Sequence, residues 1–468
     1  MTRGRFFSCP VFGIMVGNQS IEEENRMEKD CTTGSVVKHI VVFAVPYFVS
    51  ILLQTLYGIA DLFITGQFNS TDSITAVSIG SQIMHMLTLA IAGLAMGATI
   101  TIGKAIGSKR PEQAAKAIGN STTVFLSGSI VLMCVLIASM NGIIQIMSTP
   151  VEAAEGVKVY LGICFMGIPF ITAYNLISAV FRGLGDSKTP MYLIGIAFVC
   201  NIALDYLFIG AFSMGPAGAA LGTTLAQAVS VICALISIMK KKTGIRLHRP
   251  HFKVDRSMVQ TIMRIGLPVF LQNTFIQISF LTVTVFVNMR GLYDAAAVGI
   301  VEKMIGIMFL IPSSMHATVS ALAAQNLGAE KKERAKQTLW YAVAICICFG
   351  IATSFLTIAF APQLVGLFAE NETVIRLGAE YIKGYVWDCI FAGIHFCFSG
   401  YFCALEKSGL CFLHNFLSII LIRIPGAYFT TKLFLGTLFP LGLVTTFGSV
   451  FSAVFCLAVY LVMEKKKK

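Results

Sequence analysis

Long apolar stretches separated by short polar loops recur along this chain from about residue 39 onward. Each stretch is long enough for a helix that crosses a bilayer, which needs about 20 apolar residues. Their apolar positions are continuous rather than alternating, which excludes the strands of a membrane barrel. The pattern therefore predicts twelve transmembrane helices. These run approximately over residues 39–64, 74–99, 116–140, 157–181, 190–212, 217–239, 261–287, 295–321, 338–361, 380–403, 411–434 and 440–463.

The composition also indicates an integral membrane protein. Of the 468 residues, 56% are hydrophobic and 12% charged, against about 25% charged in soluble domains. The mean hydropathy is +0.79. A soluble globule cannot bury that much apolar surface, so disorder, a coiled coil and a soluble enzyme are excluded as descriptions of the whole chain. Most of the thirteen cysteines lie in apolar stretches without metal-binding spacing, and we interpret them as small apolar side chains.

Positive charge is distributed unevenly over the loops, and the net charge is +12. Lysine and arginine gather in the loops after the second, sixth and eighth spans and in the carboxyl tail, whereas the alternate loops hold few. Loops rich in these residues stay in the cytoplasm. Both termini of this multi-pass protein are therefore predicted to be cytoplasmic, in the cell membrane. This topology explains the basic residues without a nucleic-acid partner.

The amino end is polar and irregular up to residue 35. Met27 begins a run just ahead of the first span, so residues 1–26 are interpreted as an upstream extension or a mis-assigned start. The apolar stretch from Cys9 to Val16 is too short to span a bilayer. It also lacks a small-residue cleavage site, so no signal peptide is predicted.

The two halves of the chain match each other at an offset of about 221 residues. Pro46 pairs with Pro268, Ala76-Val77 pairs with Ala297-Val298, and Phe181 pairs with Phe402. Several matches at one offset, each in an equivalent span, indicate a duplicated unit.

Duplication of a six-helix unit predicts an all-α fold of two lobes, related by a pseudo-two-fold axis along the membrane normal. A cavity between such lobes is the usual place for a transported substrate, and rocking of the lobes gives alternating access. The expected parts are a polar extension at 1–35, an N-lobe at 36–239, a basic cytoplasmic linker at 240–260, a C-lobe at 261–463 and a tail at 464–468.

Polar residues inside the first-lobe spans define a candidate site, because such residues are costly in a membrane. Asp61 and Asp205 lie late in two spans that run in the same direction, so their carboxylates have similar depth. Asn201 shares a helix face with Asp205, and Thr223 lies in the outer third of the next span. These oxygen ligands suit a hard cation such as Na⁺. The same carboxylates could instead carry a proton, since burial and a second carboxylate favour the protonated form, or could simply be hydrated near the membrane surface.

The second lobe contains its own ionisable residues in apolar spans, namely Glu302, Lys303, Asp388, His395 and Arg423. Adjacent residues on a helix point about 100° apart, so Glu302 and Lys303 cannot both face one cavity squarely. A buried ion pair with a purely structural role and a functional site are the two interpretations of this set.

Prolines and single histidines also interrupt the apolar helices. Pro46 and Pro268 lie early in the first span of each lobe, where the loss of a backbone hydrogen bond permits a bend. Such a bend is either part of a rocking motion or a static kink. His85 and His316 are interpreted as packing or helix–helix hydrogen-bonding residues rather than proton relays.

Motifs for hydrolytic chemistry are absent from the sequence. There is no Walker-type phosphate-binding loop, so ATP hydrolysis within this chain is not predicted. There is also no G-x-S-x-G or H-E-x-x-H motif, and no soluble segment long enough to carry catalysis. The protein is therefore not predicted to be an enzyme.

Three motifs resemble the multidrug and toxic compound extrusion (MATE) transporters, over nearly all of the chain from about Met27 to Leu461. The first is Pro46 followed fifteen residues later by the aspartate of Ile-Ala-Asp-Leu-Phe at 59–63. The second is Phe-Arg-Gly-Leu-Gly-Asp-Ser-Lys-Thr-Pro at 181–190. The third is Asn201-x3-Asp205, followed by Gly-Ala-Ala-Leu-Gly-Thr at 218–223.

The resemblance implies export of organic, often cationic, small molecules in exchange for Na⁺ or H⁺, by a monomer in the lipid bilayer and without a resident cofactor. In the prokaryotic branch that this sequence resembles, the positions of Asp61, Asn201, Asp205 and Thr223 form the first-lobe cation site. The Pro46 position is linked in the family to bending of the first helix. Other candidates for the substrate cavity or for gating are Tyr57, Tyr160, Glu302, Asp388 and Arg423.

The second lobe does not repeat the acidic pair, because the offset from Asp61 leads to Thr282 and from Asp205 to Gly426. Some branches of the family use second-lobe acids instead, so Glu302 and Asp388 do not simply inherit the first-lobe role.

Other functions remain open from the sequence alone. The runner-up is a flippase for lipid-linked saccharides of the same superfamily, which predicts a more cationic central cavity. Arg182, Lys188 and Arg423 are too few, and mostly too close to the cytoplasm, to favour it. A membrane-embedded aspartyl enzyme lacks a second supporting feature, and a channel is disfavoured by the duplicated lobes. The sequence decides neither the substrates nor the coupling ion.

Overall fold

The computed structural model describes residues 31–147, 149–240 and 245–466, so most of the proposed amino-terminal extension lies outside the described part. The described residues are almost entirely helical and contain no strand. Ten helices are long and apolar enough to cross a membrane, and two bent helix pairs bring the number to twelve, as predicted. The bends, of 48° between α6 and α7 and 41° between α15 and α16, fall at equivalent places in the two lobes.

The helices of the N-lobe are α2 (Val36–Phe68), α3 (Thr71–Gly107), α4 (Pro111–Ala138), α5 (Met140–Ile146), α6 (Val151–Met166), α7 (Ile168–Gly183), α8 (Lys188–Asp205), the π-helix η2 (Tyr206–Ala211) and α9 (Gly215–Lys240). A short 3-10 helix, η3 (Arg249–Phe252), lies between the lobes in sequence. The helices of the C-lobe are α10 (Arg256–Asn288), α11 (Leu292–Met308), α12 (Leu310–Gly328), α13 (Lys332–Ala359), α14 (Ala361–Gly366), α15 (Glu372–Tyr385), α16 (Asp388–Ala404), α17 (Gly409–Ser418), the π-helix η4 (Ile419–Arg423), α18 (Ile424–Leu433) and α19 (Phe439–Lys465).

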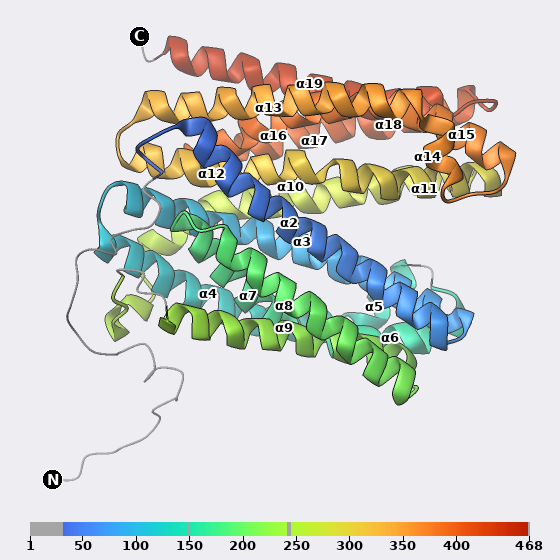
Figure 1. Ribbon diagram of the computed structural model, residues 1–468, viewed down its shortest axis with the longest axis horizontal. Helices are drawn as coiled ribbons and strands as arrows, with labels where there is room; N and C mark the ends of the chain where they lie inside the picture. The colour runs from blue at the N-terminus through green and yellow to red at the C-terminus, as the bar shows by residue number, and fades with distance from the viewer. Residues whose placement is uncertain (1–30, 148, 241–244, 467–468) are drawn as a thin grey trace.

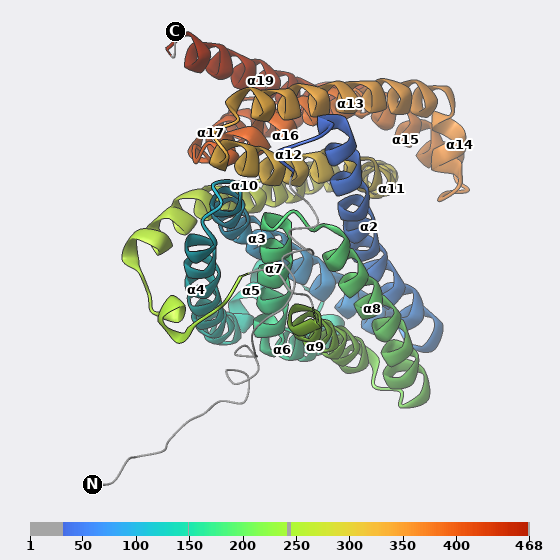
Figure 2. The ribbon, with the colours of Figure 1, turned by 60° about the vertical axis from the view of Figure 1, so that its left-hand side comes forward.

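The two lobes predicted from the repeat are visible as two helix bundles in Figures 1 and 2. The α3–α4 and α12–α13 loops, which carry the basic residues, lie at the same end as the carboxyl end of α19 (Figure 1). We call this the basic end of the molecule. The lobes share one buried core here, in which α2 packs against α12 and α3 against α10 and α12.

The linker between the lobes is shorter than expected and is anchored to the N-lobe. Helix α10 begins at Arg256 rather than near 261, because the Asp255 side chain caps it by accepting hydrogen bonds from the backbone amides of Ser257 and Met258. The Asn120 side chain donates to the carbonyl oxygen of His251 at 3.1 Å. The linker therefore lies along α4 and is not a free tether.

Side-chain contacts close the gap between the lobes at the basic end. Nζ of Lys104 in α3 lies 2.6 Å from Oε1 of Glu406, just after α16. The Gln325 side chain in α12 donates to the carbonyl oxygen of Gly183 in α7 at 2.9 Å. Gly107 lies against the backbone of Gln325 so closely that a Cβ atom there would overlap the carbonyl group. A larger residue at 107 would force the lobes apart.

At the opposite end the lobes diverge. Helices α5 and α6 of the N-lobe and α11, α14 and α15 of the C-lobe are well separated in both views (Figures 1 and 2). The cross-lobe packing of the described residues involves α2, α3, α4 and α7 on one side and α10, α12 and α13 on the other. The helix pairs that pack closely across the lobes in the described residues do not include α3 with α11.

Candidate functional site

Four polar residues predicted to share one depth lie together inside the N-lobe. Asp61 in α2 is 2% exposed, and Asn201 and Asp205 in α8 are fully buried. Thr223 in α9 donates a hydrogen bond from Oγ1 to Oδ2 of Asp61 at 3.1 Å. Asp61 also lies within side-chain interaction range of Asn201 and Asp205. We call these four residues the N-lobe cluster.

Several atoms of the N-lobe cluster are buried without a hydrogen-bond partner. These are Oδ1 of Asp61, both carboxyl oxygens of Asp205 and both amide atoms of Asn201, counted among the described residues. A buried oxygen without a donor is costly, and it becomes favourable when a cation or a proton binds there. The donor set of two carboxylates, an amide and a hydroxyl fits Na⁺, and the two adjacent carboxylates equally fit a shared proton.

Local backbone structure places Asp205 against the neighbouring helix. The regular α-helix ends at Asp205 and continues as the π-helix η2, a wider turn that is frequent at functional sites. On the facing helix, a Cβ atom at Gly222 would overlap Oδ1 of Asp205. Glycine at 222 therefore leaves the space that the carboxylate occupies, and this explains the glycine in the motif at 218–223.

If the N-lobe cluster binds the coupling cation, replacing Gly222 with alanine is expected to weaken that binding without removing any charge. The added methyl group displaces the Asp205 carboxylate, and overpacking of this kind costs about 1–3 kcal/mol, or roughly tenfold in affinity. The measurement is the cation concentration that gives half-maximal efflux. Gly195→Ala in α8 is the matched control, because its Cβ atom would lie 3.8 Å from the nearest side-chain atom, an ordinary contact. An unchanged half-maximal concentration in Gly222→Ala would contradict this account of the glycine.

Two tyrosines extend the N-lobe cluster. The Tyr57 hydroxyl donates to the carbonyl oxygen of Thr223 at 3.2 Å, which ties α2 to α9 one turn before Asp61. Tyr160 in α6 is 1% exposed, and its ring packs against Gly80 in α3. Tyr57 thus lies beside the cluster, whereas Tyr160 lies behind it in the lobe core.

The predicted proline position lies within an unbroken helix. Pro46 falls in the third turn of α2, which runs as one helix from Val36 to Phe68. The Ser50 hydroxyl donates to the Pro46 carbonyl oxygen at 2.9 Å. The bend permitted by the proline therefore does not interrupt the helix in this conformation, and its role in gating stays a prediction.

The C-lobe holds an ion pair where the sequence left two interpretations open. Asp388 lies at the bend between α15 and α16 and is fully buried, and Oδ2 lies 3.8 Å from a terminal nitrogen of Arg423. Arg423 ends the π-helix η4 and donates to the Ser449 hydroxyl at 3.1 Å. This geometry favours the structural interpretation for Asp388 and Arg423. Ser449 was missed by sequence reasoning, since a serine in an apolar helix carries no specific signal.

Glu302 and Lys303 lie on different faces of α11, as adjacent residues on a helix must. Glu302 is half-buried, and its Oε1 has no hydrogen-bond partner among the described residues. Lys303 is exposed on the neighbouring face of α11. Sequence reasoning placed Lys303 among the ionisable residues of the second lobe but did not include it in the site, since Glu302 and Lys303 cannot both face one cavity squarely.

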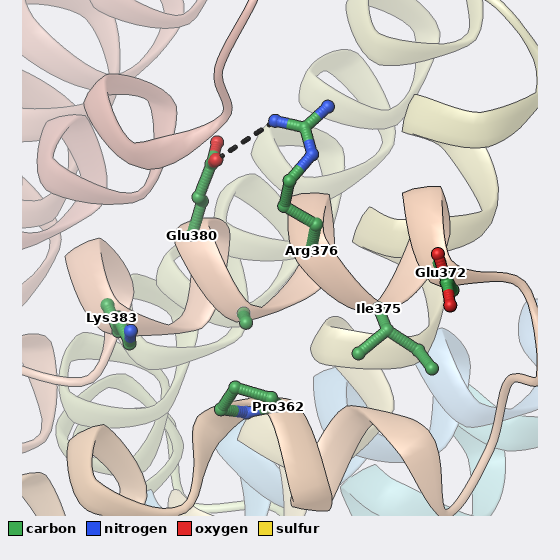
Figure 3. A pocket seen from close by; sticks show the side chains of 7 residues that line it. Pro362, Glu372, Ile375, Arg376, Glu380 and Lys383 are labelled. Carbon is green, nitrogen blue, oxygen red and sulfur yellow. Dashed lines mark hydrogen bonds and ion pairs between the residues drawn. The ribbon is translucent and has the colours of Figure 1, made fainter.

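A separate pocket lies between α14 and α15, at the end away from the basic loops. Figure 3 shows Pro362, Ile375 and Lys383 around it, with Arg376 and Glu380 joined across one helix face. That ion pair spans 3.2 Å, and Glu380 also accepts a hydrogen bond from the Thr437 hydroxyl. The charges of Arg376 and Glu380 are thus satisfied locally, and the pocket is remote from the N-lobe cluster.

A comparison with models of protein families shows which family this chain belongs to. The MatE family model matches residues 46–207 and again residues 268–429, so it covers more than half of the chain. Each match begins at the proline of the first span of a lobe. The chain belongs to the MATE family. It is therefore a multi-pass membrane transporter, and the family resemblance seen in the sequence is confirmed.

Two of the curated relatives are proteins of Bacillus subtilis. The chain is 28% identical to the probable multidrug resistance protein YpnP of Bacillus subtilis over 85% of this chain and 88% of that protein. It is 26% identical to the probable multidrug resistance protein YoeA of the same organism, over 77% and 79% of the two chains. A solved structure described as the outward-facing conformation of a MATE multidrug resistance transporter superposes with a TM-score of 0.88 at 20% identity, over 96% of this chain and all of that one. The last comparison confirms the fold of twelve helices in two lobes.

Proposed function

We propose that this MATE-family protein is a secondary antiporter that exports organic compounds in exchange for Na⁺ or H⁺. The observation that carries the proposal is the buried carboxylate pair of Asp61 and Asp205, which has no basic partner among the described residues. An unpaired buried carboxylate pair is stable only when it binds a cation or a proton. Supporting this, its curated relatives in Bacillus subtilis carry the name of multidrug resistance proteins.

The proposed mechanism couples the N-lobe cluster to the way the two lobes meet. Asp61, Asp205 and Thr223 belong to three helices, so a cation or proton bound between them draws α2, α8 and α9 together. Helix α2 also packs on α12 of the other lobe, so its position affects how the lobes meet. Cation binding would favour the state that is open away from the basic end. In that state the protein would have a lower affinity for the exported compound. Reciprocal coupling of this kind is what antiport requires.

The charges of the loops indicate which end of the molecule faces the cytoplasm in the proposed mechanism. With the basic end in the cytoplasm, the end at which the lobes diverge faces the outside in this conformation. A compound would enter from the cytoplasm in the alternate state, when the contacts at the basic end are open. Both lobes belong to one chain, so we propose that a monomer suffices.

Breaking the ion pair between Lys104 and Glu406 is expected to open the basic end more often. The two side chains are 27% and 37% exposed, and an ion pair that accessible contributes at most about 1 kcal/mol. Lys104→Gln should therefore shift the equilibrium by up to about fivefold. The measurement is faster hydrogen–deuterium exchange in residues 99–107 and 321–328, which line this contact. The charge-reversed double variant Lys104→Glu with Glu406→Lys should restore slow exchange, and unchanged exchange in Lys104→Gln would show that the pair does not hold the lobes.

The experiment that tests the antiport proposal is dye efflux from proteoliposomes. Purified protein is reconstituted and loaded with a fluorescent organic compound, and a Na⁺ gradient and a proton gradient are imposed separately. Efflux driven by one gradient identifies the coupling ion. No efflux under either gradient, from protein shown to be folded, would overturn the proposal.

One observation favours the second candidate, a flippase for lipid-linked saccharides. Lys303 is a positive charge on the exposed face of α11, and a site for a lipid diphosphate requires positive charge. Movement of a fluorescent lipid diphosphate between leaflets, with no dye efflux under either gradient, would select the flippase.

A further inference from the structure

The first helix of each lobe is preceded by a short segment that lies on the other lobe. Residues 31–35 lead into α2 and contact the start of α13 in the C-lobe. Residues 251–255 lead into α10 and contact α4 in the N-lobe. The two contact sites are equivalent in the repeat, because α4 and α13 each form the third span of a lobe. We call these segments the amino strap and the linker strap.

The amino strap is held by cationic side chains at the start of α13. Arg334 donates hydrogen bonds to the carbonyl oxygens of Thr33 at 2.6 Å and Gly34 at 2.7 Å. Nζ of Lys331 donates to the carbonyl oxygen of Thr32 at 2.8 Å. Gly34 has a φ of 73°, a left-handed conformation that glycine adopts readily, and the chain turns there toward the C-lobe. Hydrogen bonds from a charged donor are stronger than those between neutral groups, so Arg334 is the main anchor of this strap.

The linker strap is held by polar side chains of α4. Asn120 is 1% exposed, donates to the carbonyl oxygen of His251 at 3.1 Å and accepts from the backbone amide of Asp255 at 2.7 Å. The Thr123 hydroxyl donates to the carbonyl oxygen of Phe252 at 2.9 Å. One buried amide side chain thus satisfies both a carbonyl group and an amide group of the strap, which fixes the position of the strap on the helix.

Both helices continue from one lobe to the other beyond their straps. The first turns of α2, at Val36 and Ile40, lie in a core formed mainly by α12, α13 and α16, whereas Tyr57 packs with α7 and α8 of its own lobe. In α10, Ile262 lies in a core with α3, α4 and α7, whereas Val287 packs in the C-lobe. Figure 2 shows α2 passing from the side of α12 and α13 to the side of α8. Each first helix therefore begins on the opposite lobe and ends in its own.

This arrangement constrains separation of the lobes at the basic end. A helix attached to the C-lobe at one end and to the N-lobe at the other lets them part only when one attachment is released. The hydrogen bonds of the amino strap lie in exposed surroundings, so water can replace them when they break. The straps are thus the attachments that can open and form again.

We infer that the two straps form a paired latch that holds this conformation closed at the basic end, with Arg334 and Asn120 as its positioning residues. Release of both straps accompanies the state in which the lobes separate there. The duplication accounts for the pairing, since the axis that relates the lobes also relates the straps. The inference rests on the proposed function only for the statement that this separation admits the exported compound.

The experiment measures distances between the lobes by double electron–electron resonance. Full-length protein is studied in phosphatidylcholine nanodiscs, without an ion gradient or a dye, and the spin labels are carried by a non-canonical amino acid that leaves the native cysteines in place. The exposed pair Lys116 and Gln337 reports on the basic end, and the exposed pair Asp72 and Tyr293 reports on the opposite end. The members of each pair are 221 residues apart and equivalent in the repeat.

Two variants release one strap each. Arg334→Gln removes the charged donor of the amino strap, and Gly119→Ala displaces the linker strap, because a Cβ atom at 119 would overlap the carbonyl oxygen of His251. Each should raise the population with a longer 116–337 distance and a shorter 72–293 distance by roughly tenfold, the effect of losing one hydrogen bond from a charged donor or of overpacking one contact. Arg334→Lys should keep part of the closed population, since an ammonium group can still reach a carbonyl oxygen.

Lys332→Gln and Gly128→Ala are the matched controls and should leave both distances unchanged. Lys332 is exposed two residues before Arg334, so its replacement removes the same charge from the same turn. Gly128 lies in α4 like Gly119, but a Cβ atom there would meet nothing within 4 Å.

Opposite changes at the two ends distinguish movement of whole lobes from loosening of a strap alone. Unchanged distances in either strap variant, or a change confined to the basic end, would show that the straps do not hold the lobes together. Because neither a gradient nor a transported compound is used, a failure of antiport in proteoliposomes is distinguishable from a failure of the latch.

Discussion

Replacing Asp205 with asparagine is expected to abolish gradient-driven dye efflux while leaving the protein folded. The change keeps the shape of the side chain and removes the charge that we propose binds Na⁺ or H⁺. Asp205 is fully buried, with both carboxyl oxygens lacking a hydrogen-bond partner among the described residues, so its loss removes no ion pair from the fold. Coupling between two sites typically amounts to 1–3 kcal/mol, and its loss should lower ion-driven efflux by about ten- to a hundredfold.

The measurement is efflux under each gradient, together with thermal stability of the purified variant. Asp61→Asn should behave in the same way, because both carboxylates belong to the N-lobe cluster. Asp72→Asn is the matched control, since Asp72 is exposed in the first turn of α3. Unchanged efflux in both Asp61→Asn and Asp205→Asn would remove the N-lobe cluster from the mechanism.

Replacing Arg423 with methionine is expected to destabilise the protein strongly. The arginine side chain is 12% exposed, and its partner Asp388 is fully buried. Methionine fills similar space but leaves the carboxylate without a counter-charge, and breaking a buried pair from one side costs about 3–5 kcal/mol. The hydrogen bond to Ser449 is lost as well. The measurement is the melting temperature in detergent, which should fall by several degrees.

The double variant Asp388→Asn with Arg423→Met should recover most of that stability, because neither charge then remains buried. Arg376→Gln provides the comparison with an accessible pair, since Arg376 and Glu380 are 58% and 29% exposed and contribute at most about 1 kcal/mol. If Arg423→Met melts at the wild-type temperature, the pair does not stabilise the C-lobe, and Asp388 becomes a candidate for a functional carboxylate.

The lobes, the spans and the position of the N-lobe cluster could all be predicted from the sequence. Helices that cross a bilayer have a nearly fixed length and alternate in direction. The position of a residue within its span therefore gives its depth in the membrane. This is why Asp61, Asn201, Asp205 and Thr223 could be placed at one level before their contacts were known. The structure brings them together, and their role as a cation site stays a prediction for the efflux experiment.

Depth along a helix does not say which way a side chain faces. The sequence therefore did not predict which of the polar side chains are buried and which are exposed. Glu302 and Lys303 have nearly the same depth, yet the first is half-buried and the second is exposed. Likewise the pairing of Asp388 with Arg423 depends on how α16 and η4 pack, since the two residues are far apart in sequence.

The sequence by itself determined the membrane class, the duplicated lobes and the family, because hydropathy, loop charge and repeated motifs are local properties of the chain. Tertiary structure decided at which end the lobes pack together, how the N-lobe cluster is shaped by Gly222, and that Asp388 pairs with Arg423. These features depend on the rotation of each helix about its axis and on contacts between distant segments. Both are set by side-chain packing, which leaves no periodic signal in the sequence of one chain.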